Sequence, residues 1–269
     1  LLVPKYQESA ARAALPRLRA LLSAPEEARH VPRILQECGI RFVVVEALKS
    51  SKIDGVCLWL NEHSPVIGMT MRFDRMDNFW FVLRHELEHV LLGHGKVEPS
   101  LDVDLNEDVV DEEEKLANAA ASEFCAPKAR IDSFIKRKAP IFPERDFLGL
   151  AAVLGVHPAL VAGQIQFKTG RYDLFRSHMA KIRDRVLPSA VVDGWGDVAP
   201  VGLRPLHPGG ELVTADLTDQ FNLWPFAQRP GYAAAHASVG QQSEGVLAQR
   251  GVAAVGFAVA YVFNAQAVG

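Results

Sequence analysis

Apolar residues recur at two different spacings in the first third of the chain. The leucines at positions 15, 18, 21 and 22 lie on one side of a helix that we expect over residues 10–22. A second short helix is expected over residues 31–38 and ends at Gly39. Runs of β-branched, aromatic and other apolar residues then predict three strands, over residues 40–46, 55–60 and 65–71.

Helical patterns dominate the middle of the chain. A helix is expected over residues 79–92, with Asp77 as its cap and Gly93 at its end. A second long helix is expected over residues 107–124, because its acidic first half suits a helix N-terminus. Shorter helices are expected over residues 129–138, 144–154, 158–167 and 173–187. Beyond residue 193 this periodicity fades, and Gly, Ala, Pro and Gln become frequent.

These patterns suggest four segments along the 269 residues. We expect an N-terminal helical segment over 1–30, a main domain over 31–145, a helical extension over 146–203 and a tail over 204–269 whose pattern is poorly readable. The net charge of −3 gives no bulk attraction to nucleic acid. The three cysteines form no CxxC pair, and the apolar stretch 251–263 is too short to span a bilayer, so we expect a cytoplasmic protein without membrane attachment.

The strongest chemical signal is the sequence His85-Glu86-Leu87-Glu88-His89. Residues four apart lie on one face of a helix, so His85 and His89 can present two imidazoles to one metal ion. Glu86 then lies beside the open side of the ion and can act as general base toward a zinc-activated water. Large apolar residues flank the motif on both sides, which indicates a buried helix and argues against chance.

Catalytic zinc requires a third protein ligand and leaves a fourth position open. The long HExxHxxGxxH form does not fit, because Gly93 and His94 are each one residue out of register. The acidic run 111–114 can supply the ligand from the following helix, although only one of its four members can be the main ligand. His94 is a candidate for polarising a substrate carbonyl group, and a structural role at the helix end explains it equally well.

The segments RFDRMDNFWFVLRHELEHVLLGH and EKLANAAASEFCAP resemble the ImmA/IrrE zinc metallopeptidase domain. That domain has a similar HExxH helix and a second helix with an E-x-x-A-N pattern that ends in Pro. The resemblance selects Glu114 as the third ligand and places Asn118 where it can hydrogen-bond a ligand. The segments 54–60 and 65–67 are similar to strands of the same domain. Glu88 and Ala120 depart from the family pattern, which usually has Gly and Phe there.

The resemblance covers residues 30–200 and implies an α+β fold. It implies a small β-sheet packed on the HExxH helix and a second metal-ligand helix, as in thermolysin-like peptidases (gluzincins), followed by a helical C-terminal part. It also implies a Zn²⁺-dependent endopeptidase in transcription regulation or a toxin–antitoxin system. Its substrate would be a protein partner such as a repressor or toxin. A DNA-binding domain would precede Leu1, outside this chain.

Two functions follow from these observations. The first is an active endopeptidase with Glu86 as its general base and His85, His89 and Glu114 as metal ligands. The second is a regulatory module of the antitoxin type that binds a partner or DNA without efficient turnover. Residues 147–165 also permit a helix-turn-helix interpretation, but residues 158–165 offer mainly Gln164 to DNA bases, so a helical hairpin packed on the core is the simpler prediction.

Overall fold

Five strands form one mixed β-sheet in the order β4-β2-β3-β1-β5. The computed structural model describes residues 3–45, 53–96, 100–103 and 112–193, and the tail expected over 204–269 lies outside these segments. The strands are β1 (Arg41–Val45), β2 (Ile53–Trp59), β3 (Pro65–Met69), β4 (Ser100–Val103) and β5 (Val191–Asp193). β1 pairs in parallel with β3 and β5, whereas β2 pairs antiparallel with β3 and β4.

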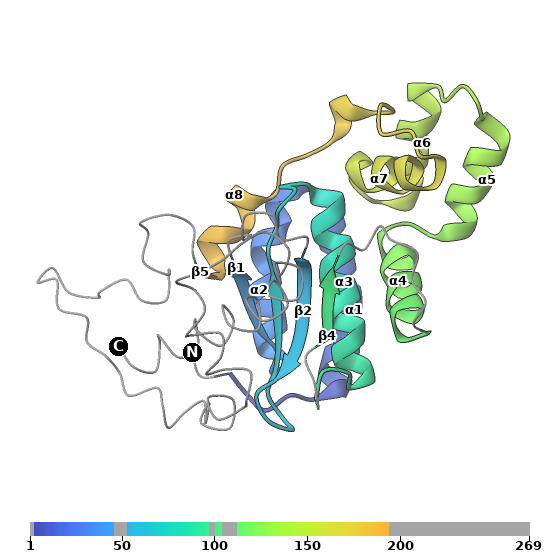
Figure 1. Ribbon diagram of the computed structural model, residues 1–269. Coiled ribbons are helices and arrows are strands. Elements are labelled where there is room, and N and C mark those ends of the chain that lie inside the picture. Colours follow the sequence, from blue (N-terminus) through green and yellow to red (C-terminus); the bar gives the residue numbers. More distant parts are fainter. Residues whose placement is uncertain (1–2, 46–52, 97–99, 104–111, 194–269) are drawn as a thin grey trace, which may run out of the picture.

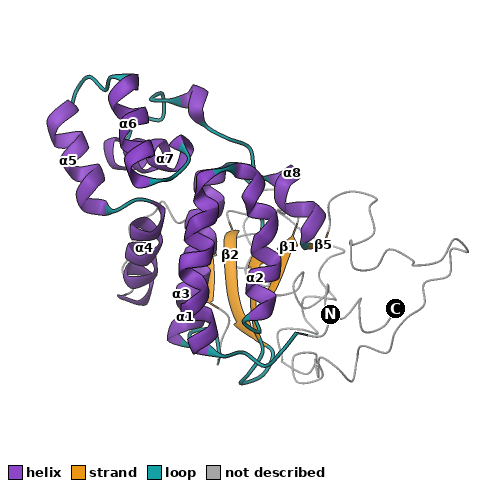
Figure 2. Ribbon diagram, turned by 180° about the vertical axis from the view of Figure 1, so that it is seen from behind, coloured by secondary structure: helices purple, strands orange, loops and turns teal. Residues whose placement is uncertain are grey.

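Helices cover one face of this sheet (Figures 1 and 2). They are α1 (Glu8–Ala20), α2 (Val31–Glu37) and α3 (Met76–Leu92). Alternate strand residues face them and join one buried hydrophobic core, as the two-residue period of a strand requires: Phe42, Val44, Cys57, Trp59, Ile67 and Met69. The expected α+β fold is therefore confirmed, and its relation to thermolysin-like peptidases stays a prediction.

A helical group lies along α3 and beyond one of its ends (Figure 1). It comprises α4 (Glu112–Cys125), α5 (Lys128–Lys138), α6 (Glu144–Leu154) and α7 (Pro158–Thr169). A Cβ at Gly163 of α7 would overlap the Asp77 side chain, so α7 packs tightly on the start of α3. Most of α7 is buried, and Gln164 donates a hydrogen bond to the Ser122 carbonyl at 3.0 Å. The segment therefore packs on the core, as the helical-hairpin prediction requires.

The N-terminal part of the chain holds the helical group in place. After α1 come two 3-10 turns, Leu21–Ser23 and Pro25–His30. The backbone N–H of His157, just before α7, donates to the Leu22 carbonyl at 2.8 Å, and Arg19 donates to the Cys125 carbonyl at 3.3 Å. Buried residues from Ala11 to Ala190 belong to one core cluster. The expected division at residues 30, 145 and 203 stays a prediction.

Two local predictions are wrong. Asp77 does not cap α3: the N-cap is Arg75, whose guanidinium binds the Asp77 carboxylate through two hydrogen bonds of 3.0 and 2.7 Å. Residues 173–187 do not form one helix. Phe175 adopts a left-handed conformation with φ 56°, and the segment contains only two 3-10 turns, Arg176–His178 and Leu187–Ser189, and the four-residue α8 (Arg183–Val186).

Within the described segments, no single helix has the length and apolar composition needed to cross a membrane. Helices α6 and α7 meet those criteria only as a pair, and they are bent by 116° at the break between them. The three cysteines all lie in described segments, where they are buried and form no disulfide.

Candidate metal centre

Two histidines from the middle of α3 converge at the centre of the site. His85 and His89 are one helical turn apart, are fully buried, and have their Nε2 atoms 3.0 Å from each other. Large apolar side chains on the rest of α3, including Phe79, Trp80 and Val90, hold this helix against the sheet and α4. The expected pairing of the two imidazoles on one helix face is therefore what the structure shows.

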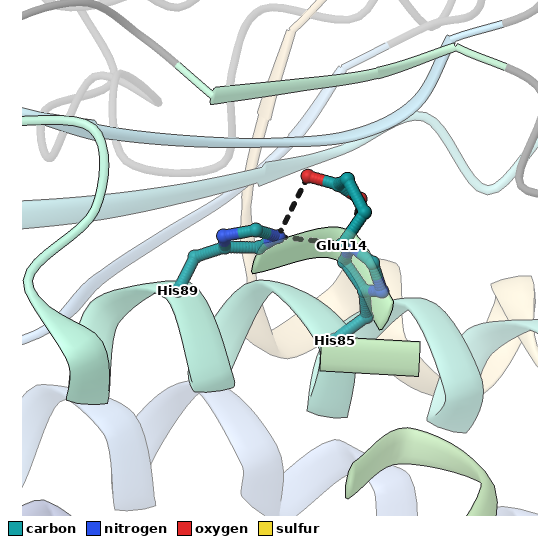
Figure 3. A group of neighbouring side chains, drawn as sticks. All are labelled: His85, His89 and Glu114. Atoms are coloured by element: carbon teal, nitrogen blue, oxygen red, sulfur yellow. Dashed lines mark hydrogen bonds and ion pairs between the residues drawn. The ribbon is translucent and has the colours of Figure 1, made fainter. Parts of the chain in front are cut away.

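Glu114 in the first turn of α4 completes the group (Figure 3). Its Oε2 lies 3.1 Å from His85 Nε2, and its Oε1 lies 3.3 Å from His89 Nε2. Burial by itself would raise the pKa of the Glu114 carboxyl, but hydrogen bonds and charge attraction from the two histidines outweigh it and lower that pKa. The three side chains thus form a group that can hold a metal ion (the metal-binding group), and its carboxylate is ionised.

The distances between the donor atoms fit one ion. Around a tetrahedral ion with bonds of about 2.05 Å, ligand atoms lie about 3.3 Å apart. His85 Nε2 lies 3.0 Å from His89 Nε2 and 3.1 Å from Glu114 Oε2, and His89 Nε2 lies 3.3 Å from the other carboxylate oxygen, Glu114 Oε1, so each of these separations is close to this value. Two imidazole nitrogens and one carboxylate oxygen are donors that suit a divalent transition metal. The group can therefore hold such an ion with His85, His89 and Glu114 as ligands.

Asn118 orients the first histidine. It lies one turn after Glu114 on α4, and its Oδ1 is 3.0 Å from His85 Nδ1. An amide oxygen can only accept, so the Nδ1–H of His85 donates this bond and Nε2 is the ring nitrogen that faces the metal-binding group. Asn118 was expected to hydrogen-bond one of the metal ligands, and its contact with His85 agrees with that expectation.

His94 contacts the second histidine on its outer side. Its Nδ1 lies 2.9 Å from His89 Nδ1, the ring nitrogen that does not face the group, and 3.4 Å from Glu113 Oε2. The loop of His94 is fixed to the sheet, because Trp59 Nε1 on β2 donates to the His94 carbonyl at 2.8 Å. His94 therefore supports His89, and its expected role toward a substrate carbonyl stays a prediction.

Glu86 lies between α3 and the sheet. Its side chain is fully buried, and a Cβ at Gly55 of β2 would overlap the Glu86 carboxylate. Only glycine leaves room for this carboxylate beside the strand. The expected role of Glu86 as general base stays a prediction, and its place next to His85 on α3 is compatible with it.

Two other acidic residues of α3 and α4, Glu112 and Glu88, form ion pairs with basic residues. Glu112 is exposed and pairs with Lys115 at 2.7 Å, and Asp111 lies outside the described residues. Glu88, which departs from the family pattern, pairs with Arg84 one turn earlier on α3 at 2.6 Å. Because Arg84 neutralises it, Glu88 adds no unpaired charge to the interior. Ala120 is half-buried on α4.

Sequence reasoning missed two residues that shape the site, Gly55 and Trp59. Gly55 lies in the segment that resembles a strand of the ImmA/IrrE domain, but its closeness to Glu86 depends on how α3 packs on β2. The hydrogen bond from Trp59 to the His94 loop joins residues 35 apart in the sequence and has no local signal.

No protein-family model matches the chain, and none of the curated proteins compared with it matches either. The donor atoms themselves therefore carry the argument for what the group binds.

Proposed function

We propose that this chain is a zinc-dependent endopeptidase of the ImmA/IrrE kind with a gluzincin-like site. The observation that carries the proposal is the convergence of His85, His89 and Glu114 within hydrogen-bonding distance of one another. Two His and one Glu are the ligand set of thermolysin-like catalytic zinc sites, which keep one position for water or substrate. When bound, zinc supplies Lewis-acid chemistry that lowers the pKa of water and polarises a carbonyl group.

The chain's own residues would perform the remaining tasks. Glu86 would take a proton from the attacking water and return it to the leaving amine, since it is the carboxylate that follows the first ligand on α3. Asn118 would keep the Nε2 atom of His85 available by holding its Nδ1–H. His94 would do the same for His89 through the contact between their Nδ1 atoms.

The position of β2 and β4 in the sheet favours an extended peptide as the substrate. β2 carries Gly55 next to Glu86, and β4 follows β2 at the edge of the sheet as the structure describes it. An edge strand can pair with an extended peptide through main-chain hydrogen bonds. The proposed substrate is therefore an extended segment of a protein. A repressor or toxin is the partner that the ImmA/IrrE resemblance suggests.

The test combines metal analysis with one variant. We expect the purified chain to bind about one zinc ion and to cleave labelled casein in a reaction that a chelator stops and added zinc restores. Glu86→Gln should keep the metal but lose activity by at least about 100-fold, as expected for removal of a general base. Glu112→Gln, a change of the same kind at an exposed position on α4, serves as control and should stay active.

Two results would decide against an active peptidase. A chain that takes up no zinc under any loading condition would end the proposal altogether. Zinc binding without cleavage, together with a Glu86→Gln variant that retains its function in cells, would instead identify a regulatory module that binds a partner.

A further inference from the structure

A cavity of about 360 Å³ lies next to the metal-binding group. Its walls are the first turns of α3, the last turns of α4 and one side of α7, and its lining residues include none of the three proposed ligands. Cavities of this size hold compact organic ligands. Glu86, Asn118 and His94, the other residues with a role in the proposed peptide hydrolysis, do not line it either.

Aromatic side chains surround the cavity. Phe73, Phe167 and Tyr172 line it and are 46%, 59% and 54% exposed, which is unusual for large apolar side chains that lie together. Phe81, half-buried on α3, lines it as well. Four aromatic rings around one hollow favour a flat aromatic group as the occupant, because offset or edge-to-face ring pairs are stabilising.

The polar groups of the cavity carry no net charge. Arg75 binds Asp77 through two hydrogen bonds and also donates to Gln166 Oε1 at 3.0 Å, so both charges are already paired. Gln164 uses its Nε2 in a bond to the Ser122 carbonyl, and no hydrogen bond within the described segments uses its Oε1. A neutral ligand with one hydrogen-bond donor therefore fits better than an ion.

We propose that this cavity is a second binding site, for a neutral aromatic group that carries a hydrogen-bond donor. Such a group can arrive as a free small molecule or as a side chain of a peptide held at the metal centre. Two residues that line the cavity lie near residues of that centre. The Phe81 ring lies 6.3 Å from the His85 ring, centroid to centroid, and Ser122 follows Asn118 by one turn on α4.

The first experiment measures binding of N-phenyl-1-naphthylamine, a neutral aromatic amine, to the metal-free full chain by fluorescence. We expect saturable binding that weakens about fivefold in Phe167→Ala, which removes one ring contact. Ser122→Trp, which fills the cavity from α4, should abolish it. The matched control is Val153→Ala, because Val153 is 75% exposed on α6 and does not line the cavity. Absence of saturable binding, or equal affinity in all four proteins, would overturn the proposal.

The second experiment identifies the source of the aromatic group by displacing the probe. Indole should displace it equally with and without zinc if the ligand is a free small molecule. An alanine peptide with one tyrosine, whose phenol supplies the donor, should displace it better from zinc-loaded Glu86→Gln than from metal-free protein if a peptide side chain is the ligand. Only the displacement by a peptide rests on the proposed peptidase function, since the first experiment needs neither metal nor turnover. Failure of both competitors to displace the probe would contradict the assignment of the site.

Discussion

Removing the side-chain oxygen of Asn118 tests how the proposed metal centre is organised. In Asn118→Ala, the Nδ1–H of His85 loses its acceptor at 3.0 Å, and the imidazole is no longer held with Nε2 facing Glu114 and His89. Such outer contacts of histidine ligands typically contribute 10- to 100-fold in metal affinity, or about 1.4–2.8 kcal/mol. Asn118 is half-buried, so water can replace part of the lost bond. We therefore expect a loss near 10-fold, or about 1.4 kcal/mol.

The assay is a competition titration of zinc against a chromophoric chelator at pH 7. Asn118→Asp provides the matched variant, because it retains an oxygen acceptor at the same position and should bind zinc at least as well as the original chain. Asn78→Ala removes the same kind of side chain from α3, away from the metal-binding group, and should leave zinc affinity unchanged. The reasoning is refuted if Asn118→Ala folds normally and binds zinc within twofold of the original affinity.

Three further predictions concern neighbouring residues. Gly55→Ala should lower kcat/KM for peptide hydrolysis by about 100-fold with little change in zinc affinity, because the new Cβ displaces Glu86; unchanged kinetics would contradict this packing. In metal-free protein, the stability advantage of the original chain over Glu114→Gln in urea titrations should be complete above the ordinary pKa of 4.5. It should be lost as pH falls through the lower folded pKa, and an advantage independent of pH would be evidence against an ionised Glu114. Burial raises the pKa of the Cys125 thiol to about 12. Iodoacetamide at pH 8 should therefore label Cys125 only after unfolding, and rapid labelling of Cys125 in the native protein would contradict this prediction.

Much of the metal centre could be predicted because its signals are local. His85 and His89 share a helix, and their spacing alone places them on one face. Glu114 was harder, since four consecutive acidic residues offered the same chemistry, and the family resemblance was needed to choose among them. The structure separates those that it describes by their partners: Glu112 binds Lys115, Glu113 contacts His94, and Glu114 meets the two histidines.

Predictions failed where tertiary contacts outweigh local preference. Residues 173–187 have helical composition, yet Asp74 Oδ1 accepts hydrogen bonds from the backbone N–H groups of Ile182 and Arg183 and fixes the chain at the start of the four-residue α8. The left-handed Phe175 stacks on Phe147 with ring centroids 3.8 Å apart. Neither contact has a signature in the sequence, because each joins positions that are distant along the chain.

The bonds that join the start of the chain to its helical group bear on how the protein can be divided. The His157 N–H before α7 binds Leu22 in the turn after α1, and the Arg19 guanidinium near the end of α1 binds the Cys125 carbonyl at the end of α4. Leu18 and Leu22 lie inside the shared interior. A fragment made only of the sheet and the two ligand-bearing helices would expose that interior to water. A shortened version of this chain that keeps its fold consequently needs the first helix and α7 as much as His85, His89 and Glu114.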